Sequence, residues 1–565
     1  MQPRTRRLKR IFCLKRIFRL KAEATGIKGG ILASALLAAL ASGAVHLAAQ
    51  PPAQGLRVEI SFSQGARAEP VTGMVYLAIS RDSQSPPIQQ TDPEGVPLFS
   101  AFVQDLKPGT PAIITRENRG HPVASLAGIP AGEYWVQPFV NLYTRFPRAD
   151  GHTVWMHMDQ WEGQNWKRSP GNLYGDPVKM RIDPASTTPI RLVADKVIPP
   201  IAVPADTDMV KRIKIQSQVL TKWWGQPIFL GATILLPKEY AKHPGVLYPV
   251  NYIQGHFSLR APGGFGTGGE FDKLWLAEDT PRFIYVTLQH PSPYYDDSYA
   301  VNSENNGPYG EAIMQELLPA IETQFRVIRQ PWARLLSGGS TGGWIAAAHQ
   351  IFYPDFYGGS FASCPDSVDF NYHQIVNIYT DPNAYYIEHG WMKVDRPTER
   401  RPDGNIVSLM KDENHYELTV GDKSRSGGQW DIWEATFSPV GKDGYPMRIW
   451  DKETGAIDHA VAEKWKKYDL LDVLKTNWAT LGPKVGHKLN VYVGDMDSYY
   501  LNDAVENLNA FWVKNGKPGE MGEIVFQRRA PHCWGPRAPE LLEKMTKQID
   551  KYAPSGADLK SWRYR

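Results

Sequence analysis

The most constraining feature of the sequence is an alternation of short apolar runs with helical segments beyond residue 206. β-Branched and aromatic runs at 228–236, 248–253, 283–288 and 333–336 predict strands, and helices are expected at 311–325 and from Thr341. Strands that are apolar throughout are buried on both faces, with helices covering those faces. The pattern therefore predicts an α/β fold with a mostly parallel sheet over 206–565.

The segment 55–198 has a different pattern. Short alternating runs, such as 56–62, 74–80 and 133–140, are separated by Gly, Pro and Asp, which predicts an antiparallel β-sandwich. Its tryptophans, Trp135, Trp155, Trp161 and Trp166, either contact a sugar or a partner, or pack in a core or interface. The Pro-rich stretch 197–204 is a natural boundary, and 565 residues suit two or three domains.

A long stretch rich in Trp and Tyr, 366–480, interrupts the strand–helix alternation. A structureless loop of that length is improbable in a folded domain, so we expect a lid-like insertion. Some of its aromatic residues either wall a substrate pocket or pack within the insertion itself: Tyr372, Tyr385, Tyr386, Trp391, Trp430 and Trp433.

Basic residues dominate the first part of the chain. Residues 1–50 hold ten Lys and Arg against one acid, and an apolar run follows at 31–49. This order predicts a signal leader over 1–49 and a periplasmic or secreted protein; an uncleaved leader would be its only membrane contact. The whole chain has a formal net charge of +4, and residues 1–50 alone have +9, so the remaining residues have a net charge of −5. A mildly acidic body of this kind excludes nucleic acid as an expected partner.

Ser340 stands in the sequence Gly338-Gly339-Ser340-Thr341-Gly342, a Gly-x-Ser-x-Gly pattern. The pattern alone is common, but here an apolar strand precedes it and a helix-forming segment follows. Such a tight strand-to-helix turn projects the serine hydroxyl above the sheet, beside a helix N-terminus. This context predicts a nucleophile, and the alternative is a helix-capping serine in a Gly-rich turn.

A serine nucleophile needs a base, and the base needs an orienting acid. The strand expected at 488–494 is followed by Asp495 and Asp497, and the strand at 524–526 is followed by His532. We predict His532 as the base and Asp497 as the acid, because Asp497 lies further into its loop. Asp495 is closer to the strand and suits a turn-fixing role, and Asp366 is the reserve acid.

Acyl transfer also needs donors for an oxyanion. The backbone amide of Thr341 follows the nucleophile directly, and the loop after 248–253 offers the amide of His256 or Phe257 next to Gly255. The sequence lacks His-Glu-x-x-His, paired Cys-x-x-Cys and P-loop patterns, so no metal or cofactor is expected.

Several of these motifs together resemble the putative esterase family of the α/β-hydrolases, over roughly 206–365 and 485–550. They are Asn-Asn-Gly-Pro-Tyr-Gly at 305–310, the helix ending at 318–322, Phe-Arg-Val at 325–327 and the Ser340 turn. Relatives include esterase-D-like enzymes, enterochelin esterases, feruloyl and acetyl-xylan esterases, and mycolyltransferases. The family's Gly-x-x-Asp stretch and its His before a Trp match Gly494–Asp497 and His532–Trp534, which supports Asp497. The insertion at 366–480 departs from the family.

The resemblance has two further implications. It implies that Cys364 and Cys533 lie near each other, as a bridge or as two independent thiols. It also implies a serine esterase acting on small-molecule or glycan esters, including carbohydrate or siderophore esters. Acyl transfer or peptide cleavage by the same three side chains is the first alternative. A non-catalytic carbohydrate-binding or envelope protein is the second.

Overall fold

The computed structural model describes residues 55–517 and 519–564, so the predicted leader at 1–49 lies outside the described residues. Gln54–Arg565 forms one compact unit, and the domain division near 198–206 stays a prediction. In the part described, no helix combines the length and the apolar character needed to cross a bilayer.

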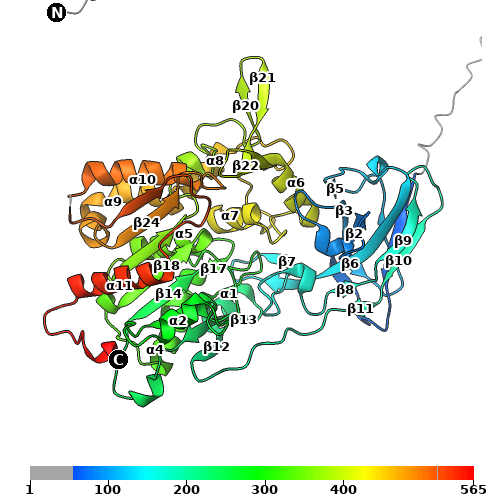
Figure 1. Ribbon diagram of the computed structural model, residues 1–565. Helices are drawn as coiled ribbons and strands as arrows, with labels where there is room; N and C mark the ends of the chain where they lie inside the picture. The colour runs from blue at the N-terminus through cyan, green and yellow to red at the C-terminus, as the bar shows by residue number, and fades with distance from the viewer. Residues whose placement is uncertain (1–54, 518, 565) are drawn as a thin grey trace, which may run out of the picture. The chain divides into compact units, whose positions relative to one another are not determined.

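An eight-stranded sheet forms the centre of the part beyond residue 206 (Figure 1). Its strand order is β12-β13-β15-β14-β18-β19-β24-β25, with antiparallel pairing at β12–β13 and β13–β15 and parallel pairing from β15 onward. The prediction of a mostly parallel α/β sheet is thus confirmed. The strands are β12 Val210–Ser217, β13 Ile228–Leu235, β14 Val250–Gln254, β15 Ile284–Gln289, β18 Arg334–Gly339, β19 Gly359–Ser363, β24 Leu489–Gly494 and β25 Ile524–Gln527.

Helices of the same part pack against the sheet through apolar residues. The central strands β14, β15 and β18 contribute buried side chains such as Tyr252, Val286 and Leu336, which explains their continuous apolar sequences. The helices outside the insertion are α1 Gln218–Trp224, α2 Glu270–Leu276, α3 Tyr309–Ala312, α4 Leu318–Gln324, α5 Thr341–Phe352, α9 Leu470–Val485, α10 Leu501–Asn515 and α11 Ala538–Tyr552, with α9 beginning within the predicted insertion range.

The helix predicted at 311–325 is present over 309–324, but it is not a regular α-helix throughout. α3 and α4 are joined by a π-helical turn at Ile313–Leu317, and Pro319 lies in the first turn of α4. Proline has no backbone N–H and its ring clashes with the preceding turn, so a regular α-helical bond to the residue four positions earlier is lost there. The apolar periodicity predicted the segment but not this irregularity.

A buried ion pair anchors the start of β18, the strand that leads to Ser340. The Arg334 guanidinium donates to both carboxylate oxygens of Glu322 at 2.7 and 2.9 Å, and the Tyr252 hydroxyl donates to the same carboxylate at 2.9 Å. Glu322 and Arg334 are 6% and 8% exposed. The bidentate pair and the third donor give each oxygen of the carboxylate at least one hydrogen bond.

We expect Glu322→Ala to lower the free energy of unfolding by about 3–5 kcal/mol, because it leaves the Arg334 charge buried without its partner. Urea denaturation measures the change. Glu311→Ala is the matched control on α3, since Glu311 is only partly buried, and it should shift stability by about 0.5 kcal/mol or less. An equal effect of both changes would contradict the importance of the pair.

The N-terminal part holds two sheets, one of three strands in the order β10-β1-β4 and one of eight strands built around β6 and β2. Valine, isoleucine and leucine side chains of β1, β2 and β10 share one apolar cluster. The strands are β1 Val58–Phe62, β2 Val71–Ser80, β3 Leu98–Leu106, β4 Ala112–Ile114, β5 Gly120–His121, β6 Gly132–Pro147, β7 Thr153–His157, β8 Leu173–Tyr174, β9 Val178–Ile182, β10 Ile190–Ala194 and β11 Lys196–Val197.

One pairing in this part departs from the antiparallel prediction. β1 pairs with β10 in parallel, with Val58 opposite Ile190. Parallel neighbours require a long connection, and these two strands stand near the two ends of the segment, with all its other strands except β11 between them. Alternation within each strand predicts its faces but carries no information on the direction of a partner so distant in sequence.

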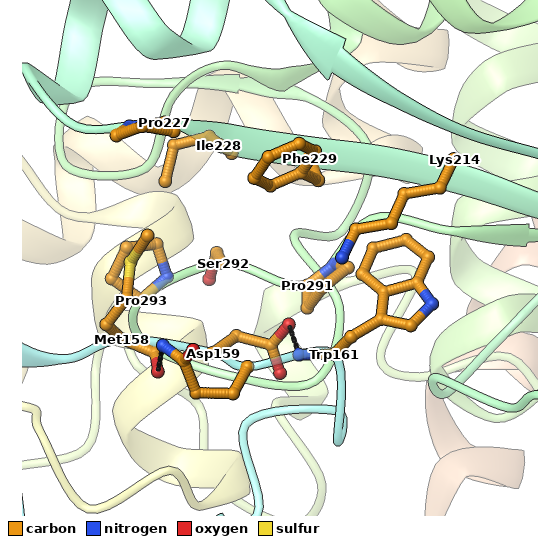
Figure 2. Close-up of a pocket in the computed structure, with 11 residues that line it drawn as sticks. Met158, Asp159, Trp161, Lys214, Pro227, Ile228, Phe229, Pro291, Ser292 and Pro293 are labelled. Atoms are coloured by element: carbon orange, nitrogen blue, oxygen red, sulfur yellow. Dashed lines mark hydrogen bonds between the residues drawn. The ribbon is translucent and has the colours of Figure 1, made fainter. Parts of the chain in front are cut away.

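Two of the tryptophans whose role the sequence left undecided are buried. Trp161 and Trp166 are 6% and 7% exposed, which favours packing over sugar contact. Trp161 lies beside a small cavity of about 140 Å³, where its backbone amide donates to Asp159 at 2.9 Å (Figure 2). The Lys214 ammonium of β12 lies 4.3 Å from the indole centroid, a cation–π contact. Trp161 therefore joins the N-terminal part to the edge of the large sheet.

The predicted insertion at 366–480 is folded. It contains two short hairpins and three helices, and α9 begins at its end. The β20–β21 hairpin projects away from the other elements of the insertion (Figure 1). The elements are β20 Tyr386–His389, β21 Met392–Asp395, β22 Pro397–Arg400, β23 Ile406–Leu409, α6 Met410–Val420, α7 Gln429–Phe437 and α8 His459–Trp465.

Candidate active site

Ser340 occupies a sharp turn between β18 and α5. Its backbone dihedrals are φ 57° and ψ −125°, which a residue with a Cβ rarely adopts. The turn closes tightly on its neighbours, since a Cβ at Gly342 would lie 2.1 Å from the carbonyl oxygen of Gln254 at the end of β14. A glycine is therefore required at 342, and the predicted strand–serine–helix context is what the structure contains.

The structure brings Ser340, His532 and Asp497 together from three separate loops. Nε2 of His532 lies 3.0 Å from Oγ of Ser340, and Nδ1 lies 2.8 Å from Oδ2 of Asp497. The Asp497 side chain is fully buried, and its Oδ1 accepts the backbone N–H of Tyr499 at 2.9 Å. Both oxygens of this carboxylate are therefore held in place.

Asp495 does not contact His532. Its carboxylate accepts the backbone N–H of Arg529, which links the turn after β24 to the turn after β25. The two loops that carry Asp497 and His532 are thus fastened to each other, and Asp495 has the turn-fixing position expected of it.

The environment of His532 favours its protonated form. Burial by itself lowers the pKa of the imidazole, but the hydrogen bond to Asp497 and the neighbouring Cys533 thiol outweigh it and raise the pKa to about 10. The ring of Tyr499 also meets the imidazole edge-on, with centroids 4.9 Å apart. This constellation stabilises positive charge on the histidine once it has taken up a proton.

Asp366, the reserve acid, accepts a hydrogen bond from the serine and makes none with His532. Its Oδ1 is 3.3 Å from Oγ of Ser340, its Oδ2 accepts the Thr341 hydroxyl at 3.2 Å, and the Tyr299 hydroxyl donates to it as well. Burial raises the pKa of its carboxyl. Sequence reasoning missed this contact, because the pairing of β19 with β18, which brings the loop after β19 past the nucleophile turn, is decided by the tertiary structure.

The segments named as oxyanion donors meet at the same place. Gly255 and Gly342 are in contact, because a Cβ at Gly342 would lie 2.9 Å from the Gly255 Cα. In the described part of the chain the backbone amides of Thr341, His256 and Phe257 donate to no other protein group. The His256 imidazole is engaged elsewhere, since its Nδ1 lies 3.0 Å from Asp296, and carboxylates there raise its pKa to about 9 despite burial.

A cavity of about 560 Å³ opens above Ser340. Of the six insertion aromatics singled out in the sequence, Trp430 and Trp433 line it, whereas Trp391 is fully exposed on the β20–β21 hairpin. Tyr385 is buried within the insertion and donates to the Lys452 carbonyl, so it does not belong to the cavity wall. The other side chains that line the cavity include several aromatic and acidic ones: Pro93, His256, Tyr295, Asp366, Gln374, Glu413, Tyr416, Glu417, Gln429, Tyr499, Leu501, His532 and Cys533.

Two groups of side chains in the described residues have metal-ligand chemistry. They are Cys364, His532 and Cys533, and His256, Asp296 and Asp297, each with ligand atoms within 4.8 Å of one another. In both groups the histidine already has a carboxylate partner, Asp497 or Asp296, so hydrogen bonding accounts for the arrangement. Cys364, buried, and Cys533, exposed, are free thiols.

Part of the chain is similar to a known protein family. Residues 230–469 match the family model described as putative esterase. No curated protein matches the chain. Among solved structures, a ferulic acid esterase is 16% identical, covering 60% of this chain and 96% of its own, with a TM-score of 0.32. An S-formylglutathione hydrolase from Agrobacterium tumefaciens is 13% identical, covering 61% and 92%, with a TM-score of 0.33. Residues 230–469 of this chain are thus similar to the putative esterase family.

Proposed function

We propose that this protein is a serine esterase in which Ser340 is acylated by the substrate and then released by water. The observation that carries the proposal is the contact of the Ser340 hydroxyl with His532 at 3.0 Å, with His532 held by Asp497 at 2.8 Å. Nucleophile, base and orienting acid are thereby linked in one hydrogen-bonded line.

In the first half-reaction, Oγ of Ser340 attacks the ester carbonyl while Nε2 of His532 takes the hydroxyl proton. Asp497 keeps the imidazole in the tautomer with its proton on Nδ1 and stabilises the imidazolium. The amides of Thr341 and of His256 or Phe257 donate to the oxyanion. His532 then protonates the leaving alcohol, and the acyl group remains on Ser340.

In the second half-reaction, water gives a proton to His532 and attacks the acyl carbonyl, and the serine leaves with that proton restored. The aromatic walls provided by Trp430 and Trp433 suit an ester with an aromatic or sugar ring, including carbohydrate and siderophore esters. We also propose export by the leader at 1–49 and a β-sandwich at 55–198, both on sequence pattern.

The test is a pre-steady-state measurement with p-nitrophenyl acetate. A burst of p-nitrophenol stoichiometric with enzyme, and a mass increase confined to the Ser340 peptide, are expected of an acyl-enzyme. Adding an alcohol distinguishes hydrolysis from acyl transfer, because a transferase would pass the acyl group to the alcohol and form a new ester. A folded protein without burst or adduct on a broad ester panel would refute the proposal and favour a binding protein.

We expect kcat/KM to rise with pH well above neutrality. General base catalysis needs the neutral imidazole, and the pKa of His532 is raised to about 10, so activity should increase about tenfold per pH unit below that value. A profile of kcat/KM from pH 6 to 10.5, corrected for spontaneous hydrolysis, measures this increase and the pH at which it levels off. A plateau already reached near pH 6.5, the ordinary histidine value, would contradict the expected shift.

A further inference from the structure

Two cysteine thiols meet directly behind the candidate nucleophile. Cys533 follows His532, and Cys364 follows β19, with their sulfurs and the imidazole within 4.8 Å of one another. Both sulfurs also lie close to Gly339, at 3.5 and 3.9 Å from the position that a Cβ there would occupy. They therefore lie on the same side of the turn that carries Ser340.

The backbone around Cys364 is tied to that turn. The Ser340 N–H donates to the Ser363 carbonyl at 3.1 Å, and the Asp366 N–H donates to the Ser340 carbonyl at 3.2 Å. Cys533, in contrast, belongs to the loop that presents His532, and its φ of 59° turns the chain just after the imidazole. A bond between the two sulfurs would link the base-carrying loop to the nucleophile-carrying strand.

We propose that Cys364 and Cys533 form a redox-active pair that closes to a disulfide when the protein meets a disulfide oxidant, and that closure changes the basicity of His532. The effect on His532 rests on the proposed function, whereas the disulfide itself does not.

The two thiols differ in the way that such chemistry requires. Cys533 is exposed and Cys364 is fully buried. A hydrogen bond from the Cys364 thiol, and after it the contact with His532, outweigh burial and lower the pKa of Cys533 to about 5. Burial raises the pKa of Cys364. Cys533 is therefore an accessible thiolate, and Cys364 is a protonated resolving partner.

The reaction balances with oxidised glutathione as the oxidant. The Cys533 thiolate attacks one sulfur, the S–S bond breaks, and one glutathione leaves as thiolate. Cys364 then loses its proton to solvent, and its sulfur attacks the Cys533 sulfur of the mixed disulfide. The second glutathione leaves, and the two released thiolates carry the two electrons that the cysteine pair has lost.

Closure should change the charge around His532. The groups that face the imidazole are Asp497 and the Tyr499 ring from the loop after β24, Asp366 and Cys364 from the loop after β19, and Cys533 on its own loop. Oxidation removes one of the negative charges, the Cys533 thiolate, and leaves the others in place. The pKa of His532 should fall, so the base becomes available at lower pH.

The experiment uses the full chain carrying Cys13→Ser, which removes the third cysteine of the sequence. After equilibration with oxidised glutathione, we expect a mass loss of about 2 Da relative to the reduced protein, no thiol reactive with a maleimide after unfolding, and a peptide linked through Cys364 and Cys533. Dithiothreitol should reverse all three. Cys364→Ser is the matched control and should yield a glutathione adduct at Cys533.

The kinetic arm compares kcat/KM against pH for the oxidised and reduced forms. On oxidation, the rise of kcat/KM with pH should move to lower pH by about one pH unit or more. The reduced Cys533→Ser variant should show the same shift without a disulfide. Failure to obtain the linked peptide under oxidising conditions would overturn the pair. If the disulfide forms and the enzyme is active but the pH dependence of kcat/KM is unchanged, the proposed effect of the disulfide on His532 is overturned. Absence of any esterase activity would refute the proposed function alone, since mass and peptide mapping test the disulfide independently.

Discussion

Ser340→Ala should lower kcat for ester hydrolysis by about 10⁵- to 10⁶-fold, the largest effect expected of any single change in this protein. Without the hydroxyl there is no acyl-enzyme, and only binding and the oxyanion donors remain to assist water. The substitution removes one oxygen that contacts His532 and Asp366, and it leaves the backbone turn intact. Thermal unfolding should therefore change little.

Labelling with a fluorescent fluorophosphonate gives a second readout that does not depend on knowing the substrate. Wild type should be labelled once, at Ser340, and Ser340→Ala should not be labelled. The matched control is Ser337→Ala on the same strand, whose buried hydroxyl accepts an amide hydrogen bond from Asn251 at 3.0 Å. This variant perturbs β18 but should keep its labelling. Full labelling of Ser340→Ala would reject Ser340 as the nucleophile.

Asp497→Asn should reduce kcat by about 10⁴-fold while the protein stays folded. Oδ2 of Asp497 accepts from Nδ1 of His532, so an amide nitrogen there would donate to Nδ1 and leave the proton on Nε2. That tautomer cannot take the serine proton, and the imidazolium would lose its counter-charge. Steady-state kinetics above pH 7 with far-UV circular dichroism separates a catalytic loss from an unfolded protein.

Asp495→Asn is the matched control, two residues earlier in the same loop. Its carboxylate accepts one backbone N–H, from Arg529, and an asparagine side-chain oxygen can accept the same bond. We expect kcat within about tenfold of wild type, with any loss arising from a looser turn. If instead Asp497→Asn were nearly as active as wild type, the orienting acid would have to be another carboxylate.

Much of the fold was predictable because its signals are local. The apolar runs that became β13, β14, β15 and β18 are buried on both faces, and that burial makes their sequences continuous and apolar. The turn at Ser340 was predictable for the same reason, since glycines at 338 and 342 record a close approach of backbone. The π-helical turn in the segment 309–324 and the parallel partner of β1 were not, because neither follows from periodicity.

The sequence by itself determined the order of the elements, the candidate serine and histidine, and the preference for Asp497, since each depends on residues within one turn of a strand end. The tertiary structure alone decided that Asp366 lies at the serine, that Trp430 and Trp433 line the cavity whereas Trp391 does not, and that two thiols adjoin the base. These are contacts between separate loops, or between the long insertion and the site. They depend on which strands are neighbours and on how side chains pack, and no local pattern in a chain encodes such neighbours.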